Sequence, residues 1–215
     1  MLIPTGFWSY TSSDENSSRG KLSLLRSLLS QELQQQIGRR PTVVIWQDVA
    51  AIPPGSEWEQ QIRSAIGETS FIIPIITPAF LQSEWCSQEI DLFRLRENEL
   101  KSKRLIFPIH FIDTSHIEER NPDECYSAST LQILKSRQWV DFRNLRLQNY
   151  ESAEVGQFLE HLAKSIRSSL REVDKSDAPR SKPTINEHLT VGAQNNSSTV
   201  IKNHTPSKIE VIREG

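Results

Sequence analysis

Hydrophobic positions alternate between two spacings along the first 173 residues. Runs rich in β-branched and aromatic residues predict strands at about 7–10, 42–46, 71–77, 105–111 and 139–142. Between them, apolar residues three or four positions apart predict helices at about 22–37, 58–66, 83–101 and 153–173. Strands that alternate with helices are typical of a mainly parallel sheet covered on both faces. The pattern therefore predicts an α/β fold.

Three connections lack this periodicity. Residues 11–18 are polar and predict a loop after the first strand, while residues 47–56 contain a Pro-Pro-Gly turn and predict a longer loop. The stretch 110–137 shows no clear period, so no element is predicted there. Pro74 and Pro108 fall inside two predicted strands, where we expect local breaks because proline cannot donate a ladder hydrogen bond.

The amphipathic pattern stops near residue 173. Residues 174–215 are rich in polar residues and prolines and include an Asn-Asn-Ser-Ser run, which is typical of a linker or tail. A length of 215 residues fits one domain with additional length. We therefore predict one domain at 1–173 and a polar linker or tail at 174–215 that is disordered or binds a partner.

Composition and charge argue against a nucleic-acid-binding, secreted or membrane-spanning protein. A formal charge of −2 and a pI near 6.2 give no electrostatic footprint for nucleic acid. The N-terminus has no secretory signal, and the longest apolar run, 71–76, is too short to span a membrane. Of the two cysteines, Cys86 and Cys125, the first falls on an apolar helix face, which favours a reduced thiol. We expect a cytoplasmic protein without nucleic-acid or membrane partners.

Most catalytic motifs are absent from the sequence. The eight glycines are scattered and form neither a phosphate-binding loop nor a dinucleotide fingerprint. The five histidines and two cysteines show no metal-ligand spacing, so no metal site is expected. No serine has a nucleophile-elbow context, and nothing gives Cys86 a histidine partner. Carboxylate chemistry is the best-supported enzymatic class that remains.

One carboxylate stands out in the predicted helix 83–101. At about 100° per residue, Glu89 projects from the apolar face, between Trp85 one turn earlier and Phe93 one turn later. A buried carboxylate must have an ion-pair or hydrogen-bond partner, be protonated, or serve a function, because burying an unpaired charge is costly. A salt bridge with Arg96, or a side chain that reaches the edge of a groove, would satisfy it without any function.

Three segments together resemble the Toll/interleukin-1 receptor (TIR) domain, in particular its bacterial NAD-cleaving branch. The first is Phe-Trp-Ser-Tyr at 7–10 followed by Asp14, the second runs from 46 to 58, and the third is Ser-Glu-Trp-Cys-Ser-Gln-Glu at 83–89. Their order and spacing are more specific than any one of them, and the resemblance covers roughly 7–170. It implies a flavodoxin-like TIR fold with a five-stranded, mainly parallel sheet and helices on both faces.

The resemblance also implies a function. It is cleavage of the nicotinamide–ribose bond of NAD+ to nicotinamide and ADP-ribose or a cyclic product, in bacterial antiphage defence signalling. NAD+ is then the substrate, and no cofactor is expected. The implied catalytic residue is Glu89, and the implied substrate-binding residues are Phe7, Ser9, Asp48, Trp58 and Trp85. Homotypic TIR–TIR self-association is implied as well, and the tail is a possible site for another partner.

Two other functions stay open at this point. A non-enzymatic TIR scaffold would act only through homotypic assembly, and a glutamate at position 89 with Trp85 one turn earlier favours the enzyme over it. A flavodoxin-like phospho-receiver needs clustered acidic residues after the first strand and a lysine near a later strand. Only Asp14 and Glu15 point that way, so this third hypothesis is weaker.

Overall fold

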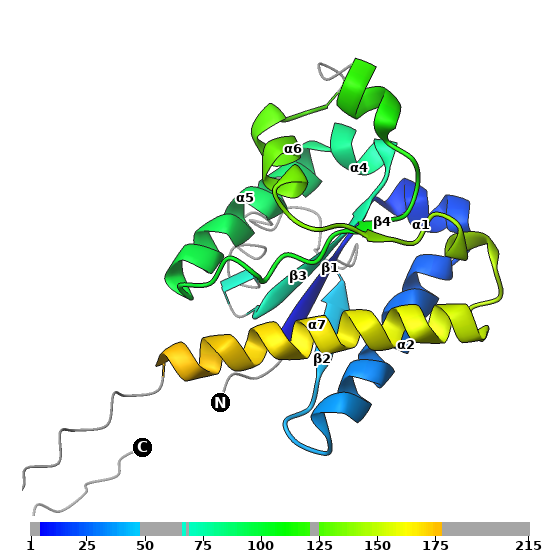
Figure 1. The fold of residues 1–215 in the computed structure, drawn as a ribbon. Helices are drawn as coiled ribbons and strands as arrows, with labels where there is room; N and C mark the ends of the chain where they lie inside the picture. The colour runs from blue at the N-terminus through cyan, green and yellow to red at the C-terminus, as the bar shows by residue number, and fades with distance from the viewer. Residues whose placement is uncertain (1–4, 48–65, 68, 121–124, 178–215) are drawn as a thin grey trace, which may run out of the picture. The chain divides into compact units, whose positions relative to one another are not determined.

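The computed structural model describes residues 5–47, 66–67, 69–120 and 125–177. Within this part of the chain, five strands form one parallel sheet in the order β2-β1-β3-β4-β5 (Figure 1). The strands are β1 (Thr5–Ser9), β2 (Val44–Gln47), β3 (Phe71–Ile76), β4 (Ile109–His110) and β5 (Val140–Asp141). This order is that of flavodoxin-like doubly wound sheets. The predicted fold class is confirmed.

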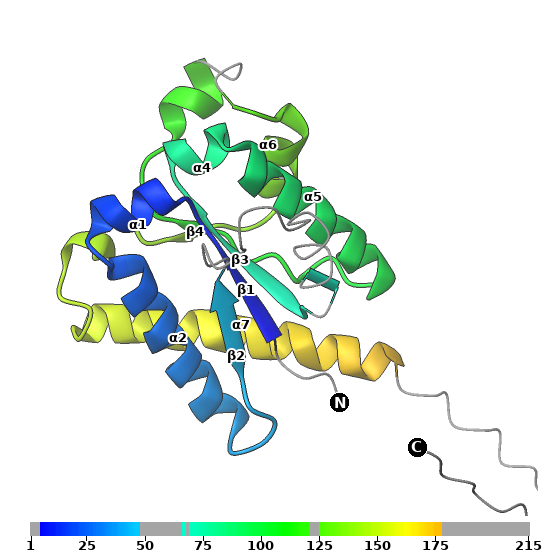
Figure 2. The same cartoon turned by 180° about the vertical axis from the view of Figure 1, so that it is seen from behind.

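Helices cover both faces of the sheet. The described helices are α1 (Ser12–Ser18), α2 (Lys21–Ile37), α4 (Pro78–Gln82), α5 (Glu84–Glu99), the π-helix η1 (His116–Arg120), α6 (Ala128–Lys135), the 3₁₀-helix η3 (Leu145–Leu147) and α7 (Ala153–Asp177). Helices α2 and α7 cross in front of the sheet in Figure 1, whereas α5 lies on the opposite face, which Figure 2 turns toward the viewer. None of the helices in the described part of the chain has the length and apolarity needed to cross a bilayer.

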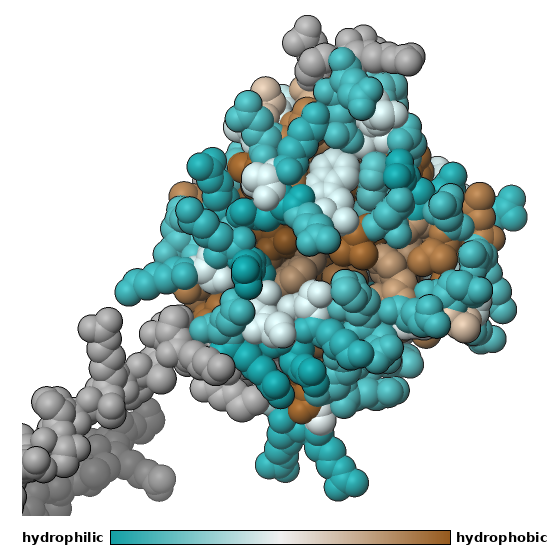
Figure 3. Space-filling model, viewed as in Figure 1, coloured by the Kyte–Doolittle hydropathy of each residue, from teal (hydrophilic) through white to brown (hydrophobic). Residues whose placement is uncertain are grey.

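The leucine spacing of α2 builds one side of the core. Leu22, Leu25, Leu29 and Leu33 are all fully buried, as expected for one face of an amphipathic helix. The chain leaves the helix at Gly38, whose φ of 98° belongs to the region that glycine adopts most readily. On the face viewed in Figure 3, apolar side chains show through between hydrophilic ones above α7, where Figure 1 places β4.

The pairing of the central strand β3 with β4 is interrupted, as the prolines predicted. All six residues of β3 are buried between β1 and β4, as a continuous β-branched and aromatic run predicts. Toward β4 the ladder is interrupted: Ile72 forms an isolated bridge with Ile106, and regular pairing resumes only at Ile75. Pro74 has no N–H to offer in the gap. The predicted strand 105–111 accordingly contains only the short β4.

The second strand was predicted to be buried, and this is wrong in part. Strand β2 begins at Val44 rather than Thr42, and the Val44 side chain is 47% exposed. The reason is topological, because β2 lies at the edge of the sheet and pairs only with β1. An apolar β-branched run predicts a strand but does not tell whether that strand is central or at an edge.

Other predicted boundaries change. The predicted loop 11–18 is the helix α1, which begins because the Thr11 side chain accepts a hydrogen bond from the backbone N–H of Asp14. The unassigned stretch 110–137 contains η1 and α6. The last helix continues to Asp177 rather than ending at residue 173. The loop 47–56 beyond Gln47, most of the helix 58–66 and the tail beyond residue 177 lie outside the described residues, so the domain and tail division stays a prediction.

Candidate functional site

The candidate site lies where the strand order of the sheet reverses. Strands β1 and β3 are neighbours, and the chain leaves their carboxyl ends toward different helices. Ser9 is the last residue of β1, and Thr77 directly follows β3. In open α/β sheets, ligands bind in the crevice outside the carboxyl ends of the strands at such a reversal. Both side chains are almost fully buried at that position.

Helix α5 brings a carboxylate to this edge of the sheet. The helix begins at Glu84, and its N-cap Ser83 accepts a hydrogen bond from the backbone N–H of Cys86 at 3.3 Å. Its buried stripe includes Cys86, Ile90 and Phe93. Glu89 belongs to the same face and is only 5% exposed. The prediction that Glu89 projects from the apolar face is therefore confirmed.

A buried hydrogen bond joins Glu89 to the end of β1. The Ser9 hydroxyl donates to Oε2 of Glu89, across 80 residues of sequence. The guanidinium of Arg96, which the sequence offered as a structural partner for Glu89, pairs with Glu99 at 2.9 Å in the last turn of α5. Two predicted site residues, Ser9 and Glu89, are thus brought into direct contact by β1 and α5.

A second carboxylate lies at the same edge: Asp14, named from the sequence only in the first TIR-like segment and in the phospho-receiver hypothesis, not among the site residues. Asp14, only 8% exposed, accepts hydrogen bonds at Oδ2 from the hydroxyls of Thr11 (2.6 Å) and Thr77 (2.7 Å). Thr77 also caps α4, since its Oγ1 accepts from the backbone N–H of Phe80 at 3.0 Å. Asp14 therefore ties the start of α1 to the end of β3. A Thr-x-x-Asp spacing at 11–14, typical of a helix start, was the available signal.

The charges of both Glu89 and Asp14 act on the buried thiol of Cys86. Burial raises the pKa of the Cys86 thiol far above its ordinary value, and the charges of Glu89 and Asp14 raise it further. The thiol is free and stays protonated at neutral pH. Cys86 is therefore a small apolar side chain of this site and not a nucleophile.

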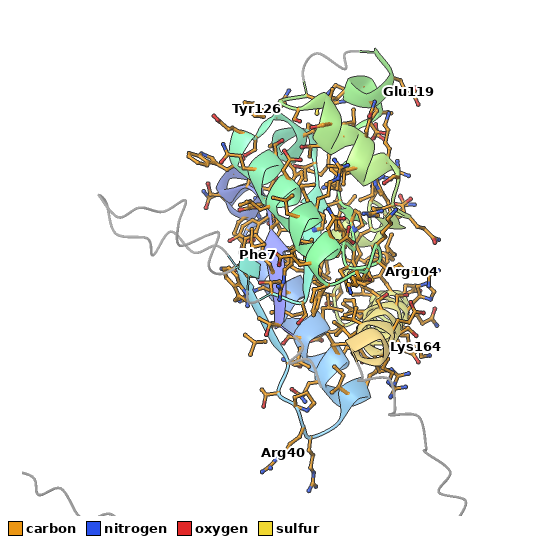
Figure 4. The ribbon with its side chains drawn as sticks, turned by 90° about the vertical axis from the view of Figure 1, so that its left-hand side faces the viewer. Phe7, Arg40, Arg104, Glu119, Tyr126 and Lys164 are labelled. Atoms are coloured by element: carbon orange, nitrogen blue, oxygen red, sulfur yellow. The ribbon has the colours of Figure 1, made fainter. Side chains whose placement is uncertain are left out.

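Phe7 occupies the core beneath this edge. Its side chain is fully buried, and its ring centroid lies 4.5 Å from that of Trp46 on β2, with a tilt of 46° between the rings. Figure 4 shows Phe7 on its strand in the interior of the fold. Its observed role is to pack the first two strands together, and contact with a substrate stays a prediction.

Trp85 was predicted to share the buried face of the helix, and this is wrong. Its side chain is 50% exposed. The buried stripe centres on Cys86, Ile90 and Phe93, and at about 100° per residue Trp85 lies roughly a quarter turn from that centre. The ring therefore lies at the rim of the helix, on the side where Glu89 projects. Asp48 and Trp58, the remaining predicted site residues, lie outside the described residues.

His110 is the last residue of β4. It is half-buried, and its Nε2 lies 3.2 Å from the Thr114 hydroxyl. Burial lowers the pKa of His110, and the charge of Arg143 lowers it further. In the part of the chain that the structure describes, no three acidic, histidine or cysteine side chains gather into a metal-binding group.

A comparison with protein-family models identifies the family of the chain. The sequence model of the TIR domain matches residues 27–159, which is more than half of the chain and includes α5 with Glu89. Among solved structures, the chain is similar to the TIR domains of the activated Roq1 resistosome that directly recognizes the pathogen effector XopQ. That match has 14% identity, covers 80% of this chain and 98% of the other, and has a TM-score of 0.40. No curated protein matches the chain.

Proposed function

The chain belongs to the TIR domain family, and from that premise we propose that it is an NAD+ glycohydrolase of the bacterial NAD-cleaving branch. The reaction breaks the nicotinamide–ribose bond and yields nicotinamide with ADP-ribose or a cyclic ADP-ribose product. Its biological context in this proposal is antiphage defence signalling. The observation that carries the proposal is Glu89, buried on α5 and hydrogen-bonded to Ser9 at the reversal of the sheet.

A single carboxylate is sufficient for this chemistry. Ordinary glycosidases use two carboxylates, one of which protonates a poor leaving group. The nicotinamide of NAD+ is already cationic, and it leaves as a neutral molecule with the electron pair of the broken C–N bond. The remaining requirement is to stabilise positive charge that develops on the ribose, which a fixed anion does strongly in a site shielded from water. Glu89 is assigned this role.

The neighbouring groups hold the carboxylate in place. The Ser9 hydroxyl fixes Oε2 of Glu89, and Ser9 itself is fixed by its position in a central strand. Asp14 and Thr77 join the adjacent elements and keep this edge of the sheet rigid. Such an arrangement orients an anion before the reaction begins, which is the condition for efficient electrostatic stabilisation.

An NAD+ consumption assay on the purified full-length chain tests the proposal. Chromatography of the reaction should show nicotinamide appearing as NAD+ disappears, together with ADP-ribose or its cyclic form. The assay is run at low and at high protein concentration. A folded protein that leaves NAD+ intact at both concentrations contradicts the proposal.

Trp85→Ala is expected to reduce NAD+ turnover more than it reduces stability. Because the ring is half exposed, its removal should cost less than about 1 kcal/mol of unfolding free energy, unlike a core tryptophan at about 3–5 kcal/mol. If the ring contacts nicotinamide, kcat/KM should fall about tenfold or more, in line with the loss of an aromatic contact. Thermal melting and steady-state kinetics give the two values.

Leu24→Ala is the matched control for Trp85→Ala. Leu24 is 48% exposed on α2, so it removes a comparably exposed apolar side chain from another helix. Its kinetics should stay close to those of the unmodified protein. Normal turnover by a folded Trp85→Ala variant argues against the assigned contact, and so does outright unfolding of that variant.

A non-enzymatic scaffold is the second candidate function. Apolar side chains remain exposed on and near α5, with Trp85 50%, Leu95 59% and Tyr126 52% exposed. Exposed apolar groups of this size favour docking to another protein surface. A chain that acts only as a scaffold would self-associate without consuming NAD+, so the two candidates separate in the assay described above.

Self-association should also control the proposed activity. If TIR–TIR contact completes the NAD+ site, mass action makes the active fraction grow with protein concentration. We expect specific activity to rise across a dilution series, in parallel with the molar mass measured by light scattering. Specific activity that stays constant while the protein remains monomeric throughout the series would refute this dependence.

A further inference from the structure

A surface hollow of about 350 Å³ shares no lining residue with the Ser9–Glu89 site. Its lining comes from three separate parts of the chain. Arg19 and Lys21 stand where α1 meets α2, Phe111 follows β4, and Arg146 and Leu147 belong to η3. The volume falls at the lower end of the range typical of small-molecule sites.

The hollow carries positive charge that the described residues leave largely unbalanced. In the described part of the chain, neither the Arg19 nor the Arg146 guanidinium makes an ion pair. Four other arginines do pair with carboxylates: Arg96, Arg104, Arg137 and Arg143. Unpaired cations that line one concave surface raise the local concentration of anions.

Lys21 is fixed at the edge of this cluster. Its Nζ donates to the backbone carbonyl of Arg146 at 3.0 Å, and it lies 5.4 Å from the centroid of the Tyr150 ring. Glu15 on α1 caps α2, since its two carboxylate oxygens each accept from the backbone N–H of Ser23 at 3.3 Å. The described residues that line the hollow include three cations and no carboxylate.

The Tyr150 ring packs against Lys21, one of the cations that line the hollow. The residue is only 5% exposed, and its hydroxyl makes no hydrogen bond in the described part of the chain. Burial raises the pKa of Tyr150 to about 12, with opposing effects from the charges of Arg146 and Glu15. The phenol is therefore protonated at neutral pH. A buried polar group without a partner is unusual in a native fold.

We propose that this hollow binds the phosphate group of a phosphorylated small molecule. Arg19, Lys21 and Arg146 supply the charge. A planar guanidinium matches two phosphate oxygens at once, which makes arginine the preferred partner for this group. The remaining volume leaves room for the body of the ligand. The site shares no residue with the Ser9–Glu89 site, so the proposal does not depend on NAD+ cleavage.

Calorimetric titration of the full-length protein with inorganic pyrophosphate tests the proposal at about 0.1 M salt, where surface charges are already screened. Arg146→Glu should weaken binding by about tenfold or more, since charge-assisted hydrogen bonds are replaced by repulsion. Lys103→Glu is the matched control, because it makes the same charge change at a basic residue of a different hollow. Its dissociation constant should stay within about twofold of the unmodified protein.

Tyr150→Phe is a second control, next to the cations but outside the lining of the hollow. The variant keeps the ring under Lys21 and removes only the unused hydroxyl, so its melting temperature should not fall. Pyrophosphate binding should stay within about twofold of the unmodified protein, because the hydroxyl is buried and Tyr150 does not line the hollow. Arg19→Gln, an exposed position, provides a second binding variant if Arg146→Glu does not fold.

ADP and vesicles that contain phosphatidic acid distinguish the source of the phosphate. Binding of ADP assigns the hollow to a soluble phosphorylated ligand, whereas binding only to the vesicles assigns it to a lipid headgroup. Either result supports a phosphate site if Arg146→Glu abolishes it. The proposal is overturned if none of the three probes binds, or if Arg146→Glu and Lys103→Glu weaken binding equally.

Discussion

Glu89→Gln is expected to abolish NAD+ cleavage while the protein keeps its fold. The substitution removes the negative charge but preserves the size of the side chain, and the amide oxygen can still accept the hydrogen bond from Ser9. Loss of one preorganised electrostatic group typically lowers kcat by about 10²–10³-fold. We expect at least that loss here, because Glu89 is the group assigned to the developing charge on the ribose.

Glu84→Gln is the control that matches this change in chemistry. Glu84 begins the same helix but is exposed, so its variant should keep normal turnover. Circular dichroism and thermal melting establish whether each variant is folded. A folded Glu89→Gln protein that consumes NAD+ at the normal rate would remove Glu89 from the mechanism, and the proposed function would then lose the observation that carries it.

Much of the fold follows from local patterns. The four buried leucines of α2 and the fully buried strand β3 were predictable because each pattern matches one period. The edge position of β2 was not, since exposure of Val44 depends on which strands are neighbours. The short helix α1 was missed because it has no apolar stripe and depends on the cap at Thr11.

Some features of the candidate site were also predictable from the sequence, and others were not. Glu89 was predictable because helical periodicity alone places it on the apolar face of α5. The position of Trp85 at the rim depends on where the centre of the buried stripe lies, and a sequence pattern fixes that only approximately. The contact between Asp14 and Thr77 spans 63 residues and arises from the pairing of β1 with β3. Local sequence contains no signal for a contact of this kind.

A second buried carboxylate on α5 shows how a structural glutamate is accommodated. Glu97 is 2% exposed, and its two oxygens have separate partners. Oε2 accepts from the Arg137 guanidinium at 2.6 Å, and Oε1 accepts from the backbone N–H of Leu105 at 2.9 Å. Glu97 thus joins α5 to the segment that follows α6 and to the approach to β4. A buried charge with an arginine partner and a backbone donor is fully accounted for by the fold.

Arg137→Met is therefore expected to lower the free energy of unfolding by about 3–5 kcal/mol, because it leaves the Glu97 carboxylate buried without its cation. Urea denaturation measures the change. Adding Glu97→Gln should recover part of the loss, since the double variant buries no charge and the amide oxygen can still accept from Leu105. Arg104→Met, which breaks the exposed pair with Glu172, should cost less than about 1 kcal/mol. A loss for Arg137→Met as small as that for Arg104→Met would mean that water reaches Glu97 and that its burial is not maintained.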